Sequence, residues 1–256
     1  MIRAFATRDA LMHAAAETIA NALNKGISAR GEGVAALSGG STPEPAYEAL
    51  AALPLNWKRV TFLLVDERFV PTSDGASNEA MLRRALARAF GQGAKLLPMY
   101  AHGARVDEAA QRADALYASK RIDIALMGMG ADGHTASWFP RSEQLRGALD
   151  LANPRTVISV DAPNAAGASA RLTLTRSALV RADAIAWAGS DCRPAAAIRA
   201  RVSCRSLKTG SLATSMTSWS RLAANDLLRH SSWRNSRLLR VSMCSTTPSS
   251  PATCQR

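Results

Sequence analysis

The sequence predicts an α/β protein built on a doubly wound, mostly parallel sheet flanked by helices. Short apolar runs alternate with segments of helical periodicity along most of the chain, and this alternation is typical of parallel sheets. Several apolar runs end abruptly in glycines or charged residues, as strands do at the carboxyl edge where open α/β sheets bind ligands. A chain of 256 residues can bury such a Rossmann-like core as one domain.

The chain starts with a short expected strand and an amphipathic helix, in which alanines, Ile19 and Leu23 form a packing face. Further strands are expected at 33–37, 60–65, 96–100, 122–127, 156–160, 171–175 and 184–188. Helices are expected near 9–24, 43–52, 78–90, 106–119 and 176–182, with a loop or short helix at 142–150. No apolar run reaches membrane length, and Asp9 and Glu17 argue against an export signal. We therefore expect a cytoplasmic protein without a membrane partner.

The first candidate loop follows the strand at 33–37 and consists of Ser38, Gly39, Gly40, Ser41 and Thr42. Pro43 suits the first position of the next helix, and a Ser or Thr before it suits the cap. Bare amides and the dipole at a helix N-terminus favour an anion. The loop lacks the Walker A and GxGxxG spacings and contains no lysine, which favours a phosphoester over a nucleoside triphosphate. A simple capped helix start is the alternative.

The second candidate loop follows the strand at 60–65 and begins with Asp66-Glu67-Arg68. It leads through Ser77 and Asn78 into another expected helix. Arg68 can make a bidentate contact with a phosphate or a carboxylate. Asp66 and Arg68 can also pair with each other as a structural salt bridge, and both interpretations can hold together.

The third candidate loop follows the apolar run 124–127 and contains Gly128, Gly130 and Gly133. Glycines let the backbone turn sharply and approach a ligand closely. Asp132 and His134 lie within this turn. A lone histidine in a plain strand-to-helix connection would be the simpler interpretation, but an acid, an imidazole and three glycines together favour a site.

The segments SGGSTP at 38–43, VDERFVP at 65–71 and GMGADGHTASWFP at 128–140 resemble the three signature segments of the bacterial 6-phosphogluconolactonase family, in the same order. The related glucosamine-6-phosphate deaminases share the fold and a similar DGH turn. Their second segment typically reads Asp-Glu-Tyr, and their third continues towards Phe-Asn-Glu-Pro. Arg68 and the continuation to Pro140 therefore favour the lactonase. The resemblance covers roughly the first three quarters of the chain.

The resemblance implies hydrolysis of 6-phospho-D-glucono-1,5-lactone to 6-phosphogluconate in the oxidative pentose phosphate pathway. His134 is the expected general base for attack of water on C1, and Asp132 is expected to orient it. Arg68 and the loop 38–42 are expected to hold the phosphate and so position the lactone, with Asp66 and Gly130 also lining the substrate. A single histidine and scattered acids give no metal site, and no nucleotide or other cofactor is implied.

Other functions stay open. The runner-up enzyme is an aminosugar-phosphate isomerase or deaminase with Asp66 as the base for proton abstraction. From different classes, the chain could be a sugar-phosphate sensor without turnover or an inactive sugar-phosphate-binding relic. A serine nucleophile would be an alternative chemistry, but no GxSxG elbow occurs.

The chain changes character after Gly189. Residues 190–256 hold 11 of the 32 Lys and Arg residues, only 2 of the 20 Asp and Glu residues, and all four cysteines. A basic tail could bind nucleic acid or acidic membrane, and cysteines could bind zinc or form disulfides. The cysteine spacing contains no CxxC pair, and disulfides do not fit a cytoplasmic protein. We expect no nucleic-acid partner and a monomer.

The resemblance implies a lysine that opens a helix after the strand at 184–188, and then a closing strand. Here no lysine follows until Lys208, which matches no motif. Strand and helix periodicity also become faint. We therefore predict that residues 1–189 form the lactonase domain. The basic, Ser/Arg/Cys-rich tail 190–256 is predicted to be no native domain but a segment translated out of frame.

Overall fold

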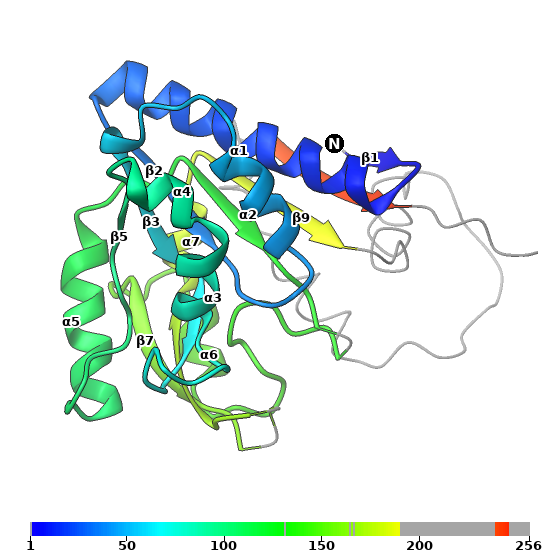
Figure 1. Cartoon of the computed structure of the whole chain (residues 1–256). Coiled ribbons are helices and arrows are strands. Elements are labelled where there is room, and N and C mark those ends of the chain that lie inside the picture. Colours follow the sequence, from blue (N-terminus) through cyan, green and yellow to red (C-terminus); the bar gives the residue numbers. More distant parts are fainter. Residues whose placement is uncertain (1, 131, 164, 166, 190–238, 246–256) are drawn as a thin grey trace, which may run out of the picture.

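Seven parallel strands form the central sheet of the computed structural model, which describes residues 2–130, 132–163, 165, 167–189 and 239–245 (Figure 1). Their order across the sheet is β1-β10-β9-β6-β2-β3-β5, and every neighbouring pair is parallel. The strands are β1 (Ile2–Phe5), β2 (Gly33–Leu37), β3 (Val60–Leu64), β5 (Lys95–Leu96), β6 (Ile124–Met127), β9 (Ala184–Gly189) and β10 (Leu239–Ser245). This confirms the predicted doubly wound α/β class.

A second, antiparallel sheet lies beside the carboxyl ends of the central strands. It has the order β4-β8-β7, in which β4 is Asp66–Arg68, β7 is Val157–Asp161 and β8 is Ala170–Leu174. The sequence predicts β7 and β8 as strands but does not separate them from the parallel sheet. The antiparallel sheet matters for the site because its strand β4 carries Asp66 and Arg68, two of the predicted site residues.

Helices connect the strands of both sheets. They are α1 (Arg8–Arg30), α2 (Glu44–Ala51), α3 (Asn78–Ala85), α4 (Ala87–Gly91), α5 (Val106–Ala118), α6 (Leu145–Leu149) and α7 (Arg176–Val180), with a 3-10 turn η1 at Trp57–Arg59. Helix α1 packs against α2 and β2, and α5 packs against β7 (Figure 1). The predicted single helix at 78–90 is two helices, and α1 extends six residues beyond its predicted end at 24.

Local sequence explains where the longest helix begins and ends. Thr7 accepts a hydrogen bond from the amide of Ala10 at the start of α1, as expected of an N-cap. Gly31 follows the last turn with φ of 79°, and its amide donates to Ile27 O. This left-handed conformation strongly favours glycine.

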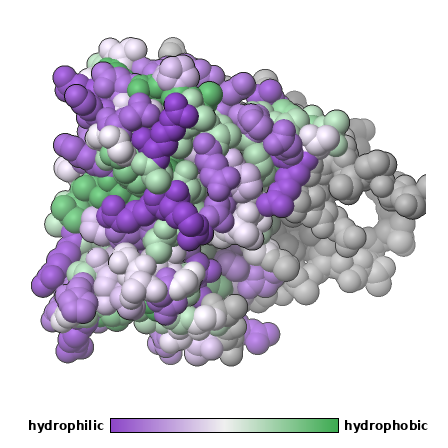
Figure 2. All heavy atoms as spheres, viewed as in Figure 1, coloured by the Kyte–Doolittle hydropathy of each residue, from purple (hydrophilic) through white to green (hydrophobic). Residues whose placement is uncertain are grey.

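The core lies on both faces of the central strands. Every residue of β2, β3 and β6 is buried, as expected where helices cover both faces of a parallel sheet. The visible face of the molecule shows hydrophilic side chains over much of its area, with smaller apolar areas between them (Figure 2). Among the helices of the described residues, none is long and apolar enough to cross a membrane.

Strand β10 differs from the sequence prediction. It lies in the segment where no regular element is expected, and it occupies the place between β1 and β9. A signal exists in the sequence, because Leu239, Val241 and Met243 alternate with less apolar residues. The other tail residues, including Lys208 and three of the four cysteines, lie outside the described part of the chain.

Candidate active site

The three predicted loops meet at the carboxyl edge of the central sheet. From β2 the chain moves outward to β3 and β5, and then returns to the other side of β2 with β6. This reversal is a topological switch point, the place where open α/β sheets bind ligands. The loops after β2, β3 and β6 therefore converge because these three strands are neighbours (Figure 1).

Hydrogen bonds hold the loop after β2 at both of its ends, at Ser38 and at Ser41. The amide of Ser38 donates to Leu126 O at 3.1 Å, and Tyr47 Oη donates to Ser38 O at 2.7 Å. Arg8 Nη2 donates to Ser41 O at 3.1 Å. Gly40 has φ of 100°, which a side chain would strain. The buried hydroxyl of Ser38 has no hydrogen-bond partner among the described residues.

The predicted cap of the following helix is wrong in detail. Helix α2 begins at Glu44, Pro43 occupies the cap position itself, and no side chain caps the helix. The reason is that residues 41–43 form a separate turn before the helix.

The loop after β3 is organised around Glu67, which is completely buried. Its carboxylate accepts hydrogen bonds from the amides of Arg68, Asn78 and Glu79, each at 2.7 Å, and from Ser77 Oγ at 3.1 Å. Ser77 also caps α3 by accepting from the amide of Ala80. Burial raises the pKa of Glu67 to about 7, although these four donors act in the opposite direction.

Arg68 is half-buried, and its Nη1 donates to Ala76 O at 3.1 Å and to Asn78 Oδ1. Asn78 Nδ2 in turn donates to Asp66 O at 2.8 Å. The alternative Asp66–Arg68 salt bridge does not occur among the ion pairs of the described residues, because Asn78 and Ala76 take its place beside Arg68. Asp66 instead accepts a 2.7 Å hydrogen bond from Ser137 Oγ of the third loop.

The loop after β6 places the predicted acid and imidazole together. His134 Nδ1 lies 2.5 Å from Asp132 Oδ1, and the His134 amide donates to the same oxygen at 3.2 Å. A β-carbon at Gly130 would collide with the His134 ring, so a larger residue here would displace that ring. Burial would raise the pKa of Asp132, but the hydrogen bonds and charge of His134 outweigh it and hold the pKa below its usual value.

The backbone behind His134 is strained. Ala136 is buried and has φ of 50°, a left-handed conformation that costs a residue with a β-carbon about 1–3 kcal/mol. Thr135 Oγ1 donates to Gly128 O at 2.7 Å, and Trp138 Nε1 donates to Leu174 O at 2.9 Å. These bonds anchor the turn to β6 and β8.

Two residues near this site are not singled out by the sequence, Phe139 and Arg171. The Phe139 ring lies on the His134 imidazole, with centroids 4.3 Å apart and planes at 30°. The guanidinium carbon of Arg171 lies 5.4 Å from the centre of the Phe139 ring. Arg171 is directly opposite Arg68 in the antiparallel β4–β8 pair. Only the fold creates this relationship, because the two arginines are far apart in the sequence.

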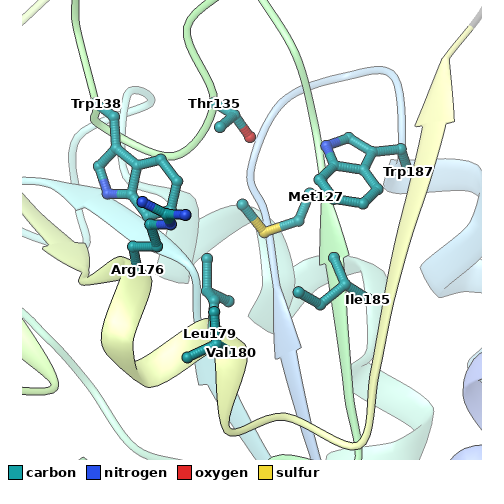
Figure 3. A pocket seen from close by; sticks show the side chains of 8 residues that line it. All are labelled: Met127, Thr135, Trp138, Arg176, Leu179, Val180, Ile185 and Trp187. Carbon is teal, nitrogen blue, oxygen red and sulfur yellow. The ribbon is translucent and has the colours of Figure 1, made fainter. Parts of the chain in front are cut away.

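A cavity lies behind the third loop, between β6, β9 and α7. Met127, Ile185 and Trp187 line it on the sheet side, and Trp138, Arg176 and Leu179 lie across from them (Figure 3). Its volume is about 10 Å³, which is space for roughly one water molecule. The cavity is therefore too small for a sugar phosphate. The residues around it pack against Thr135 and Trp138 of the third loop. Among the described residues, no group of three or more His, Cys, Asp or Glu is placed to hold a metal ion.

Glycine-rich loops, an arginine and an acid–histidine pair at the switch point of a parallel sheet define a class: α/β proteins with a site for a small anionic ligand. The model of the glucosamine-6-phosphate isomerases/6-phosphogluconolactonase family matches residues 6–207. The chain therefore belongs to the glucosamine-6-phosphate isomerase/6-phosphogluconolactonase family.

Individual relatives lie on the lactonase side of this family. The chain is 39% identical over 185 residues to the 6-phosphogluconolactonase of Caulobacter vibrioides, a match that covers 72% of this chain and 80% of the relative. It is 41% identical over 172 residues to the 6-phosphogluconolactonase of Pseudomonas putida, a match that covers 67% of this chain and 70% of the relative. The crystal structure of a 6-phosphogluconolactonase from Shewanella baltica is similar with a TM-score of 0.78 and 26% identity, over 96% of this chain and 97% of that one.

Proposed function

We propose that this chain hydrolyses 6-phospho-D-glucono-1,5-lactone to 6-phosphogluconate, the lactone-opening step of the oxidative pentose phosphate pathway. The observation that carries the proposal is the Asp132–His134 pair, which lies at the switch point beside the Arg68 loop. The relatives that are named 6-phosphogluconolactonase support it. We infer that residues 1–189 carry the whole lactonase site, because every proposed site residue lies between Ser38 and His134, whereas β10 adds a strand to the central sheet between β1 and β9.

His134 is the proposed general base. An ionised Asp132 accepts a hydrogen bond from Nδ1–H of His134, so the proton stays on Nδ1 and the lone pair of Nε2 faces away from the acid. Nε2 takes a proton from water while the water oxygen attacks C1 of the lactone. The bond between C1 and the ring oxygen then breaks, and the imidazolium returns its proton to the ring oxygen as it leaves. The product is the open-chain acid.

Arg68 is the proposed centre of the phosphate site. The two hydrogen bonds that its side chain makes to the described residues both use Nη1, so we assign Nε and Nη2 to the phosphate oxygens. A guanidinium suits this role because its donors form a planar fork that matches two oxygens. The loop Ser38–Thr42 would contribute amides from the neighbouring strand end, and the unpartnered hydroxyl of Ser38 would contribute a further donor.

The second candidate function is isomerisation or deamination of an aminosugar phosphate, because the family description includes that activity. It would use Asp66 as the base. Asp66 Oδ2 already accepts a 2.7 Å hydrogen bond from Ser137 Oγ, so one of its two oxygens is engaged inside the protein rather than available to a substrate. This contact favours the lactonase.

A direct comparison of substrates separates the two. Purified full-length protein is given freshly generated 6-phosphogluconolactone, with the spontaneous hydrolysis rate subtracted, and in parallel glucosamine 6-phosphate with an ammonia assay. We expect lactone hydrolysis and no ammonia. Ammonia release faster than lactone hydrolysis would reverse the order of the two proposals.

We further propose that the protein acts in the cytoplasm as a monomer on a small-molecule sugar phosphate, without a nucleic-acid partner. Size-exclusion chromatography with light scattering tests the monomer. A mass of about 27 kDa is expected from the chain mass of 27.1 kDa, and twice that mass would contradict it.

A further inference from the structure

The side chains of Arg171, Phe139 and His134 lie in contact one after the other, and we call these three side chains the column. The Phe139 ring contacts the imidazole of His134, and the guanidinium of Arg171 lies over the same phenylalanine ring. A guanidinium over an aromatic face is attracted by the negative face of the ring. Asp132 meets the same imidazole at its Nδ1 edge. The ring of His134 is therefore held at one edge and on one face.

Arg171 is suited to anchor this column because it is buried and lies in a regular strand. It is 3% exposed, and its Nε donates to Ala168 O at 2.7 Å. Its backbone lies in β8, the central strand of the antiparallel sheet, and pairs with Arg68 on one side and Val160 on the other. Phe139, by contrast, lies in an irregular segment and is only half-buried.

The charge of Arg171 is only partly offset by acids of the protein. Burial lowers the pKa of Arg171, and the nearby Arg68 lowers it further, whereas Asp66 and Glu67 act to raise it. The two acids and two arginines thus form one compact cluster on β4 and β8. Because its guanidinium lies over the Phe139 ring and its Nε donates to Ala168 O, Arg171 is better placed to support that ring than to capture a phosphate.

We propose that Arg171 is a positioning residue that holds His134 through the ring of Phe139. The inference rests on the proposed function, in which His134 is the general base. Asp132 fixes the tautomer and one edge of the imidazole, and the Arg171–Phe139 pair fixes its plane. Displacement of a catalytic group by about 1 Å can cost a rate factor of roughly 100, so the column matters for turnover and not for binding of the phosphate.

Steady-state kinetics tests the division between turnover and binding. Arg171→Met and Phe139→Leu are each expected to lower kcat roughly 10- to 100-fold and to leave KM for the phosphorylated lactone nearly unchanged. The double variant is expected to lose no more than the worse single variant, because both changes break one column. Arg171→Lys keeps the cation and is expected to recover part of the lost kcat. The matched control is Arg83→Met, which removes another arginine that lies over a phenylalanine, Phe90, at 5.8 Å.

A second measurement does not depend on turnover. The imidazole C–H resonances of the four histidines are recorded by NMR, with His134→Gln to assign the signal of His134. The ring current of Phe139 shifts this signal in the parent protein. We expect Phe139→Leu and Arg171→Met to move or broaden it, and Arg83→Met to leave it unchanged.

The outcomes separate this inference from the proposed function. If the parent protein hydrolyses the lactone but Arg171→Met changes KM and not kcat, Arg171 binds the phosphate and the positioning role is wrong. An unchanged His134 resonance in Arg171→Met overturns the inference as well. If the parent protein shows no turnover, the proposed function fails, and the His134 resonance alone decides whether Arg171 holds the imidazole.

Discussion

Gly39 lies against the side-chain amide of Asn78, so closely that a β-carbon at Gly39 would overlap the Asn78 Oδ1 and Cγ atoms. The contact joins the loop after β2 to the start of α3. Asn78 also accepts from Arg68 and donates to the carbonyl of Asp66. Gly39 therefore sets the distance between the two halves of the proposed phosphate site.

The first prediction concerns this contact. Gly39→Ala pushes Asn78 away and should disturb Arg68, so kcat/KM for the phosphorylated lactone should fall at least about tenfold. Gly75→Ala is the matched control, because a β-carbon at Gly75 meets nothing within 4 Å. Equal activity of the two variants would show that the Gly39–Asn78 contact does not organise the site.

The second prediction concerns the phosphate. Arg68→Ala should mainly raise KM for the phosphorylated lactone, because a charge-assisted bidentate contact disappears. The loss of kcat/KM on an unphosphorylated gluconolactone should be much smaller. Similar losses on both substrates would mean that Arg68 acts structurally, through Asn78 and Ala76.

The third prediction concerns the buried carboxyl of Glu67. Burial raises its pKa from the ordinary 4.5 to about 7, so the folded state keeps this proton over a range where the unfolded state has lost it. The unfolding free energy of the parent protein should therefore fall relative to that of Glu67→Gln as the pH rises from about 4.5 to 7, and the difference should be flat above 7. Urea unfolding at several pH values measures it. A difference that grows with pH would show that the four hydrogen-bond donors outweigh burial.

Most of the site edge could be predicted from the sequence. Each of the three loops follows an apolar strand and carries glycines or charges within its first few residues, and these signals are local. Because side chains alternate between the two faces of a strand, the sequence also indicates that Asp66 and Arg68 lie on one face and Glu67 on the other. The hydrogen bonds that the buried Glu67 makes with α3 are not visible in the sequence. The pairing of Asp66 with Ser137 depends on how two loops meet, which no local pattern gives.

Two features could not be predicted because they depend on distant strand pairing. Arg171 lies inside β8, where nothing local distinguishes it, and its position opposite Arg68 results from the antiparallel register. Strand β10 pairs in parallel with β1 and β9, and such pairing joins segments far apart in the chain. The change of composition after Gly189 obscured the alternation at Leu239–Ser245.

The fourth prediction concerns β10. A chain that ends at Gly189 lacks the strand that lies between β1 and β9, and β1 has no other partner among the described strands. Its melting temperature should be lower than that of the full chain by at least about 5 °C. Equal melting temperatures would instead support the composition-based prediction that the segment after 189 is no native part of the fold.

The most direct test of the account is the rate of 6-phosphogluconolactone hydrolysis by the parent protein and by His134→Ala, above the uncatalysed rate. If His134 is the general base oriented by Asp132, the variant should lose turnover by roughly 10²–10⁴-fold, while KM and the folded far-UV circular dichroism spectrum stay close to those of the parent. Near-normal turnover in a folded His134→Ala protein would contradict the account.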